Sequence, residues 1–446
     1  METIVALSTP HGESGIAVVR LSGPMCGPMA QSIFGRPSLL PRHCHHGSYR
    51  DKDGQILDSV LYVYFPQGHS YTGEEMLEIS THGNPFIVRK IIHDLVERGG
   101  RHAEPGEFTR RAFLNGKIDL CQAEAVADLI HAQSERDLKA AQRQLNGEFS
   151  RYLQDLMDSL VKDLALVEAF LDFPEEDLPE ESLQNLNEEI SSALRTMERL
   201  LETHRRRPPS EIRTVIAGPP NAGKSTLFNI LLGQARALVS PTPGTTRDFI
   251  GESISLGSYG LRLVDTAGIR ETSDETERQG IEKTREQLSS ADLILLVLDG
   301  SQPIVEWPDG IVHFFADDRT LVLINKMDLP TVLPIPVPYF EHLEQRPVSL
   351  MNTSSSREIT EYLQRLCERR FGNNDEASFM VYDRHADALD EARQRLQSAQ
   401  SILGNERIDC LAAELKEAIR ALERITGRVD YEKVLDLIFS RFCIGK

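Results

Sequence analysis

The sequence has few of the features that mark secreted, membrane-spanning or nucleic-acid-coating proteins. Its six cysteines are scattered along 446 residues without a C-x-x-C pair, a pattern typical of reduced thiols in a cytosolic protein. No apolar run reaches the ~18 residues that a membrane-spanning helix needs. Lys and Arg number 49 against 68 Asp and Glu. The resulting net charge of −19 disfavours a cationic nucleic-acid sleeve and leaves room only for a local basic patch.

The first residues also lack the pattern of a secretory signal, because residues 1–5 contain an early acid and no basic stretch followed by an apolar one. Hydrophobic residues make up 40% of the chain and charged residues 26%, which is typical of soluble globular proteins. At ~100–200 residues per domain, the length predicts two to four domains. We therefore expect a cytoplasmic protein of several domains with no membrane partner.

The secondary-structure pattern of the N-terminal region is mixed. Residues 16–21 and 60–65 are predicted to be strands, the second bounded by an acidic residue and a proline. Residues 85–98 place apolar side chains on one face at helical spacing and are followed by two glycines that can end a helix. Residues 1–118 are therefore predicted to form an α/β or α+β domain.

Helical patterns on both sides of an α/β block predict an inserted domain. Apolar residues recur at three/four spacing within residues 153–167 and again within 408–422, as in packed helices. Between them, near-continuous apolar strands alternate with helices, as in a mostly parallel sheet buried on both faces. We predict an α/β domain at residues 210–372, inserted into an all-α domain made of residues 119–209 and 373–446. The predicted strands are residues 214–217, 261–264, 293–298 and 321–324.

Residues 218–225 (GPPNAGKS) fit the phosphate-binding pattern G-x-x-x-x-G-K-[ST] between a predicted strand and a predicted helix, which is the context that this pattern requires. The glycines allow backbone N–H groups to close around phosphate oxygens, aided by the helix N-terminus. Lys224 can reach the β- and γ-phosphates, and the hydroxyl of Ser225 can bind Mg²⁺. The motif predicts a nucleoside-triphosphate site.

Three further motifs follow the order of a GTPase. Residues 265–268 (DTAG) supply a metal-side carboxylate in Asp265 and an N–H that can sense the γ-phosphate in Gly268. Residues 244–248 (GTTRD) supply a loop threonine for Mg²⁺. Residues 325–328 (NKMD) end in a carboxylate that can accept two N–H bonds from the edge of guanine. Adenine cannot supply these bonds, which argues against an ATPase. The four motifs resemble those of the translation-factor-like GTPases.

Two positions depart from the common GTPase pattern. Ile269 follows the DTAG motif, where Ras-like proteins place a glutamine that orients the attacking water, and an apolar side chain cannot orient water. Hydrolysis therefore needs another residue, and no arginine finger is evident in the sequence. Residues 348–350 (VSL) stand where the fifth guanine motif has Ser-Ala-Lys or similar, so the contact to the guanine O6 atom stays open at Ser349 and Leu350.

Motifs outside the α/β domain resemble the MnmE (TrmE) family of tRNA modification GTPases, and the resemblance covers essentially the whole chain. The inserted domain that the sequence pattern predicts is also the architecture of that family. The matching segments are residues 4–6 (IVA), 15–23 (GIAVVRLSG), 70–75 (SYTGEE), 105–117 (PGEFTRRAFLNGK) and 442–446 (FCIGK).

The resemblance implies that the N-terminal domain binds a tetrahydrofolate one-carbon donor, in the 5,10-methylene or 5-formyl form, and supports dimerisation. The matching contacts are Arg20, Glu78 and Lys117, with Lys446 reaching in from the C-terminal end. Cys443 is a candidate functional thiol, and its alternative as a small buried residue stays open.

The resemblance also implies the ligands of the nucleotide site. Ser225 and Thr246 match the Mg²⁺ ligands of the family. Taken with the motifs above, the GTP-binding residues are predicted to be Asn221, Ala222, Gly223, Lys224, Ser225, Thr226, Ser240, Thr242, Thr245, Thr246, Asp265, Thr266, Ala267, Gly268, Asn325, Lys326, Asp328 and Ser349.

A potassium ion is implied by the asparagine of the phosphate loop. In the potassium-dependent branch of these GTPases, the residue that matches Asn221 helps to hold K⁺ where an arginine finger would otherwise place its charge. Glu277 matches the glutamate that positions the attacking water, the task that Ile269 cannot perform. The implied K⁺ contacts are Asn221, Ser240, Thr242 and Thr245.

The resemblance implies an activity shared between two proteins. Family members act as homodimers with an FAD-dependent partner of the GidA (MnmG) type in a heterotetramer. Together they install an aminomethyl-type (carboxymethylaminomethyl) group at C5 of the wobble uridine of certain tRNAs. The rival function is a non-catalytic switch whose flanking domains only bind partners, and a pure switch would not need the predicted folate residues. The substrate tRNAs, the tRNA-binding surface and the choice between ammonium and glycine as nitrogen donor stay open.

Two groups of histidines invite roles that we do not expect. Residues 43–46 (HCHH) have metal-binding side chains, but adjacent side chains diverge and Arg42 repels cations, so we expect a surface loop. His82, beside Gly83, is expected only to close a turn.

Overall fold

The computed structural model describes residues 2–35, 39–132, 134–172, 180–205, 211–236, 252–257, 259–265, 284–304, 311–315, 319–371, 379–403 and 408–427, and then 435, 438, 439, 442, 444 and 445. The chain divides into two compact units. The first consists of Met1–Ile130, Ala141–His204 and Phe379–Lys446, and the second of His131–Ala140 and Arg205–Ser378. The second unit thus interrupts the first in sequence.

The N-terminal domain is built on a six-stranded sheet with the strand order β3-β4-β5-β2-β1-β6. Neighbouring strands run antiparallel except β1 and β6, which are parallel. The predicted strands at residues 16–21 and 60–65 are confirmed within β2 and β4. The strands are β1 (Ile4–Leu7), β2 (Ser14–Ser22), β3 (Cys44–Arg50), β4 (Ile56–Phe65), β5 (Met76–Gly83) and β6 (Arg101–His102).

Helices α1 (Cys26–Phe34) and α2 (Pro85–Glu97) bury their apolar faces against this sheet. The side chain of Asn84 accepts a hydrogen bond from the Phe86 N–H, and a proline at the first helical position suits that start. The predicted helix at residues 85–98 is therefore confirmed. A third helix, α3 (Glu107–Leu114), follows β6.

The expectations about histidines are wrong in one respect, because both segments belong to strands. Residues 44–46 lie in β3, an edge strand, although Cys44 and His46 are exposed as a surface position requires. His82 lies within β5, and its carbonyl accepts from the Asn84 N–H at 2.8 Å, which closes the tight turn before α2. Its ring Nδ1 lies 2.7 Å from Oδ1 of Asp58. Polar side chains on the open face of an antiparallel sheet do not give an apolar strand signal, which is why these segments read as loops.

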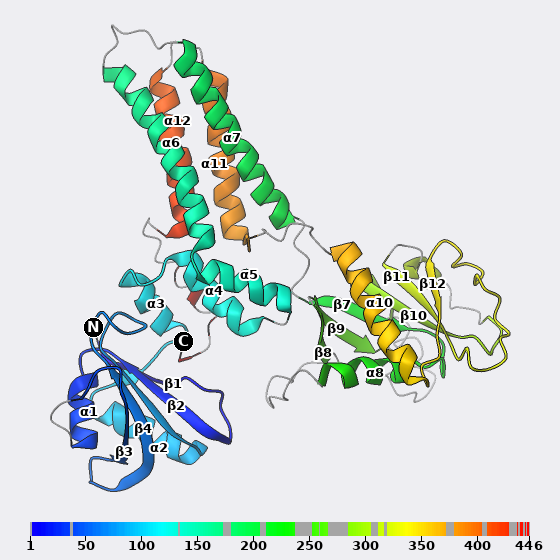
Figure 1. Ribbon diagram of the computed structural model, residues 1–446, viewed down its shortest axis with the longest axis horizontal. Coiled ribbons are helices and arrows are strands. Elements are labelled where there is room, and N and C mark those ends of the chain that lie inside the picture. Colours follow the sequence, from blue (N-terminus) through cyan, green and yellow to red (C-terminus); the bar gives the residue numbers. More distant parts are fainter. Residues whose placement is uncertain are drawn as a thin grey trace. The chain divides into compact units, whose positions relative to one another are not determined.

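The helical domain combines segments from both sides of the inserted unit. Figure 1 shows its four long helices, α6, α7, α11 and α12, running alongside one another. Their shared core includes Leu160, Met197, Leu396 and Leu415, whereas Val161, which the apolar spacing placed in the α6 stripe, is 47% exposed. The helices are α4 (Leu120–His131), α5 (Glu135–Leu145), α6 (Glu148–Asp172), α7 (Glu180–Arg205), α11 (Asp383–Ile402) and α12 (Ile408–Thr426).

The inserted α/β domain contains a six-stranded sheet with the order β12-β11-β10-β7-β9-β8, parallel except for the antiparallel pair β8 and β9. Strand β11 is buried along its whole length, as its continuous apolar run predicts. Each of the four strands predicted for this domain is confirmed. The elements are β7 (Ile212–Ala217), α8 (Lys224–Arg236), β8 (Glu252–Leu256), β9 (Tyr259–Asp265), β10 (Leu293–Asp299), β11 (Thr320–Asn325), β12 (Glu344–Pro347) and α10 (Thr353–Phe371).

The predicted architecture is thus confirmed: an N-terminal α+β domain, a helical domain, and a mostly parallel α/β domain inserted in the helical one. Among the residues that the structure describes, no helix combines the length and the apolar character needed to cross a membrane. The five cysteines within the described ranges are all free thiols.

Candidate functional site

The phosphate-binding motif lies where strand β7 ends and helix α8 begins. The side chain of Lys224 is nearly buried, and its Nζ donates to the carbonyl oxygens of Gly218 (2.9 Å) and Pro219 (2.8 Å). Ser225 follows in the first turn of α8 with its side chain exposed. A loop that meets a helix N-terminus attracts anions, so the site suits a phosphate chain, and the Ser225 hydroxyl can hold a metal ion beside it.

Asn221 occupies the exposed part of this loop in the left-handed backbone conformation, with φ of 61°. Asparagine is among the few residues that tolerate this conformation. Its exposed side chain carries an amide oxygen, the kind of ligand that the predicted K⁺ site requires.

Asn325, the last residue of β11, connects the phosphate loop to the segments predicted to recognise the base. Its side chain is buried and donates from Nδ2 to the Ala222 carbonyl (2.8 Å), while its Oδ1 accepts from the Leu350 N–H (3.0 Å). A Cβ at Gly223 would lie 2.2 Å from the Asn325 Nδ2, so the approach requires glycine there. One amide thus fixes three loops at the carboxyl edge of the sheet, where ligands bind in open α/β folds.

Lys326 is held by a residue that the sequence analysis did not single out. Its Nζ lies 2.5 Å from Oδ2 of Asp299, the last residue of β10. Burial raises the pKa of Asp299, but hydrogen bonds from Lys326 and Ser301 outweigh this effect and bring the pKa below its usual range. An acid at the carboxyl end of a buried strand was the available signal, because that edge of a parallel sheet carries the ligand site.

The carboxylate of Asp328 is exposed and accepts a hydrogen bond from the Ser349 hydroxyl at 2.5 Å. That hydrogen bond lowers the pKa of Asp328. The fifth motif thus supports the carboxylate that would read guanine, and its Leu350 N–H is used by Asn325.

Several predicted nucleotide-site residues lie outside the described residues. Asp265 ends β9 beside Ile216 of β7, which places its backbone next to the start of the phosphate loop. The predictions that fall outside the described ranges concern Ser240, Thr242, Thr245, Thr246, Thr266, Ala267, Gly268, Ile269 and Glu277.

Two of the predicted folate residues form a cross-strand ion pair. Arg20 of β2 stands opposite Glu78 of β5, and its Nε and Nη2 lie 2.9 and 2.8 Å from Oε1 of Glu78. The guanidinium carbon lies 5.9 Å from the centre of the Tyr71 ring and 5.8 Å from that of Phe108. Rings at this distance favour a cation over their faces, so the guanidinium is held in place while the pair stays partly exposed.

Lys117 contacts the loop that carries Tyr71. Its side chain is exposed, and its Nζ donates to the Gly68 carbonyl (3.0 Å). The structure brings Arg20 and Glu78 into direct contact and places Lys117 on the neighbouring loop.

The described part of the C-terminal segment packs against the N-terminal domain. Ile444 pairs with Pro105, and the Gly445 carbonyl accepts from the Ser8 hydroxyl at 3.2 Å. Phe439 and Phe442 are buried in a cluster with Leu120. Cys443 and Lys446 themselves lie outside the described residues, so the thiol and the folate contact predicted for them stay predictions.

Within the described ranges, one group of side chains has metal-like spacing, formed by Cys121, Glu124 and His385. The Nε2 of His385 lies 2.9 Å from Oε2 of Glu124 and 3.9 Å from the Cys121 sulfur. The Arg384 guanidinium, however, binds both carboxylate oxygens of Glu124 at 3.1 and 3.0 Å and lies 2.9 Å from the same His385 nitrogen. Because a permanent cation already occupies this position, we interpret the group as a buried ion-pair network and not as a metal site.

Comparisons with known proteins cover the whole chain. Residues 120–443 match the sequence model of the family described as "MnmE helical domain". Residues 3–117 match the model described as "GTP-binding protein TrmE N-terminus". The tRNA modification GTPase MnmE of Opitutus terrae is 45% identical over 451 residues, covering 100% of this chain and 99% of that protein. The protein of that name from Aquifex aeolicus is 39% identical over 452 residues, covering 100% of both. Among solved structures, the G domain of the T. maritima FeoB iron transporter matches at 20% identity and a TM-score of 0.25, covering 35% of this chain and 99% of that chain.

Proposed function

This chain belongs to the MnmE (TrmE) family of tRNA modification GTPases, and we propose from that premise that it couples GTP hydrolysis to modification of the wobble uridine of certain tRNAs. Proteins of this family are GTPases linked to tRNA modification, so the chain is expected to bind GTP and Mg²⁺ and to hydrolyse GTP. The finer proposal is that an aminomethyl-type (carboxymethylaminomethyl) group is added at C5 of the uridine with a tetrahydrofolate one-carbon donor.

The main structural support for a GTP site is the pair of hydrogen bonds made by the side chain of Asn325. It joins the phosphate loop at Ala222 to the segment of Leu350, one residue after the serine that supports Asp328. A triphosphate site and a guanine-reading carboxylate are therefore built into one rigid edge of the sheet.

Hydrolysis is proposed to depend on K⁺ and on a glutamate. Asn221 offers an amide on the exposed part of the phosphate loop, next to where charge develops in the transition state. We assign the remaining K⁺ contacts to Ser240, Thr242 and Thr245, the Mg²⁺ ligands to Ser225 and Thr246, and the water-positioning role to Glu277.

The one-carbon site is proposed at the Arg20–Glu78 pair, with Lys117 and Lys446 as further contacts. A guanidinium already paired with a carboxylate and flanked by two aromatic rings offers N–H donors and ring surface to a pterin or to the ligand's own carboxylates. Such a pair is not needed by a non-catalytic switch, which is the rival function.

The proposed setting follows the family. The chain would act in the cytoplasm as a homodimer, with an FAD-dependent partner of the GidA (MnmG) type in a heterotetramer. The proposed domain boundaries are residues 1–118, 119–209, 210–372 and 373–446. Residues 1–118 would also serve dimerisation.

Titration calorimetry with the full chain and 5-formyltetrahydrofolate tests the one-carbon part. We expect saturable binding that Arg20→Ala removes, with GTP hydrolysis unchanged. If the unaltered chain binds no reduced folate, the switch function is the better account.

A further inference from the structure

The loop of residues 68–75 (the strap) contacts two residues of the proposed folate site, Lys117 and Arg20. We propose that the strap is a positioning element for that site, in which Gly73 sets the place of Lys117 and Tyr71 holds the guanidinium of Arg20. The inference rests on the proposed reduced-folate function and names residues that the family resemblance did not assign.

At the first end, the strap leaves no room for a side chain beside Lys117. A Cβ at Gly73 would lie 3.1 Å from the Asn115 Cβ and 3.3 Å from the Lys117 Cγ. The Asn115 amide donates to the Thr72 carbonyl at 2.7 Å, and the Lys117 ammonium donates to the Gly68 carbonyl at 3.0 Å. Because these contacts are tight on both sides, the backbone of the strap determines where the Lys117 stem lies.

At the second end, Tyr71 lies against Arg20. Its ring centre is 5.9 Å from the guanidinium carbon, and its hydroxyl hydrogen-bonds with the fully buried Thr109 of α3 at 3.0 Å. Burial raises the pKa of Tyr71, so the phenol stays neutral and keeps this bond. Helix α3 thus fixes the ring, and the ring fixes the cation.

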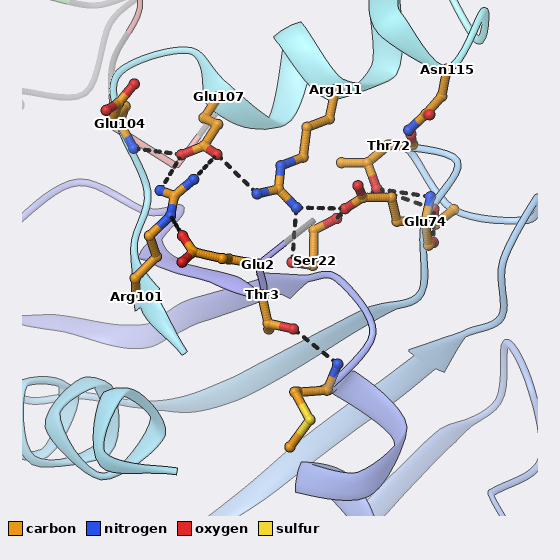
Figure 2. Close-up of polar contacts among 12 residues, drawn as sticks. Glu2, Thr3, Ser22, Thr72, Glu74, Arg101, Glu104, Glu107, Arg111 and Asn115 are labelled. Carbon is orange, nitrogen blue, oxygen red and sulfur yellow. Dashed lines mark hydrogen bonds and ion pairs between the residues drawn. The ribbon is translucent and has the colours of Figure 1, made fainter. Parts of the chain in front are cut away.

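The strap itself is anchored by a network of ion pairs that is buried at Arg111 and Glu107 and exposed at Arg101, which Figure 2 shows. Glu74 of the strap accepts from the Ser22 hydroxyl (2.8 Å) and from Arg111 of α3 (2.7 Å). Arg111 also donates to Glu107 (2.9 Å), and two nitrogens of Arg101 bind the oxygens of Glu107 at 2.8 and 2.6 Å. Burial raises the pKa of Glu107, but hydrogen bonds from Arg101, the backbone and Arg111 outweigh this effect and lower the pKa to about 2. The Glu107 carboxylate therefore stays ionised at neutral pH and keeps its ion pairs.

This arrangement joins the two structural elements that carry the proposed ligand contacts. Ser22 lies two residues beyond Arg20 on β2, and Lys117 follows the end of α3. With the strap bound to both, the cations are held at a fixed separation before a ligand arrives. Pre-organisation of this kind raises affinity because less ordering is needed on binding.

Two glycines of the N-terminal domain provide a matched pair of variants, one inside the strap and one outside it. Gly73 and Gly54 share a positive φ of 79°, so alanine strains the backbone similarly at each. A Cβ at Gly54 meets nothing within 4 Å, whereas one at Gly73 meets Asn115 and Lys117. In the full chain, Gly73→Ala should raise the Kd for 5-formyltetrahydrofolate about fivefold, and Gly54→Ala should leave it unchanged.

A double-mutant cycle separates positioning from general damage. If Gly73 acts through Lys117, then Gly73→Ala should have little further effect on the Kd in a Lys117→Ala background. At the other end, Tyr71→Leu should weaken binding more than Tyr71→Phe, because phenylalanine loses the bond to Thr109 but keeps a ring over Arg20. The comparison of Tyr71→Leu with Tyr71→Phe also tests the positioning role of the strap if Gly73→Ala does not fold.

The outcomes for the strap and for the site are distinguishable. Absence of reduced-folate binding by the unaltered chain overturns the proposed function itself. Binding by the unaltered chain, with equal Kd values for the two glycine variants and for the two Tyr71 variants, overturns the strap and leaves the site in place.

Discussion

The hydroxyl of Ser349 donates to a carboxylate oxygen of Asp328 across 2.5 Å, although 21 residues separate them in the sequence. The hydrogen bond lowers the pKa of Asp328 and orients the group. A carboxylate kept ionised in this way suits recognition of the paired N–H groups of guanine.

Replacement of that carboxylate should change base preference. Asp328→Asn turns one acceptor into a donor, so GTP affinity should fall by about 10²-fold or more while XTP affinity rises. Competition of the two nucleotides for a fluorescent analogue measures the ratio.

Ser349→Ala is the control for this substitution. It removes the supporting hydrogen bond and keeps the acceptor, so GTP affinity should fall by about tenfold or less with GTP still preferred over XTP. Retention of the GTP preference in Asp328→Asn would show that base reading lies elsewhere.

Potassium should accelerate GTP hydrolysis, whereas sodium should not. Asn221→Gly removes the amide and suits the positive φ of 61° at this position, so nucleotide binding should survive. We expect the variant to lose about 10²-fold in rate in KCl, the scale of one electrostatic contact in the transition state. Equal rates in KCl and NaCl at matched ionic strength for the unaltered chain would contradict a K⁺ site.

Asp163 should make the helical domain less stable as the pH rises. The side chain is 5% exposed, and burial, with the Glu189 carboxylate as a lesser cause, raises its pKa from 3.8 to about 7. The folded chain therefore holds a proton that the unfolded chain releases, and the free energy of unfolding falls as the pH rises from about 4 to about 7. At pH 8, Asp163→Asn should stabilise the protein by about 1–3 kcal/mol.

The matched control for Asp163 lies on the same helix. Asp155 is exposed, so Asp155→Asn should leave the pH dependence of denaturant unfolding as it is in the unaltered chain. An Asp163→Asn variant that shows the same loss of stability between pH 5 and pH 8 as the unaltered chain would assign that loss to other groups.

The Glu124 network should be structural and independent of metal. Glu124→Gln leaves the Arg384 guanidinium without its carboxylate in a mostly buried position, which should cost about 2–4 kcal/mol. Glu135→Gln, which breaks an exposed pair with Lys139, should leave the melting temperature nearly unchanged. A melting temperature that falls when EDTA is added to the unaltered chain, and recovers with Zn²⁺, would favour the metal site instead.

Local sequence signals predicted those parts of the molecule whose chemistry is contiguous. Residues 218–225 lie between a strand and a helix start, and residues 325–328 begin at the end of a wholly buried strand, so the sequence alone places both motifs. The inserted domain was predictable because the hydrophobic period changes at its boundaries.

Contacts between distant segments could not be predicted in this way. The Arg111–Glu74 pair joins residues 37 apart, and Arg384 joins Glu124 across 260, with no periodic pattern to mark either. Strand β3 was missed because it lies at the sheet edge with polar side chains on its open face. Tyr71 and Gly73 stood within a family motif, but only the three-dimensional contacts show which neighbours each one holds.

The central claim is that this GTPase serves modification of the wobble uridine, and nucleoside analysis of tRNA from cells that lack the protein tests it most directly. The account predicts loss of the aminomethyl-type group at C5 of that uridine. The gene for the unaltered chain should restore it, whereas genes carrying Arg20→Ala or a deletion of residues 443–446 should not. Wobble uridines that remain fully modified in the absence of the protein would contradict the account.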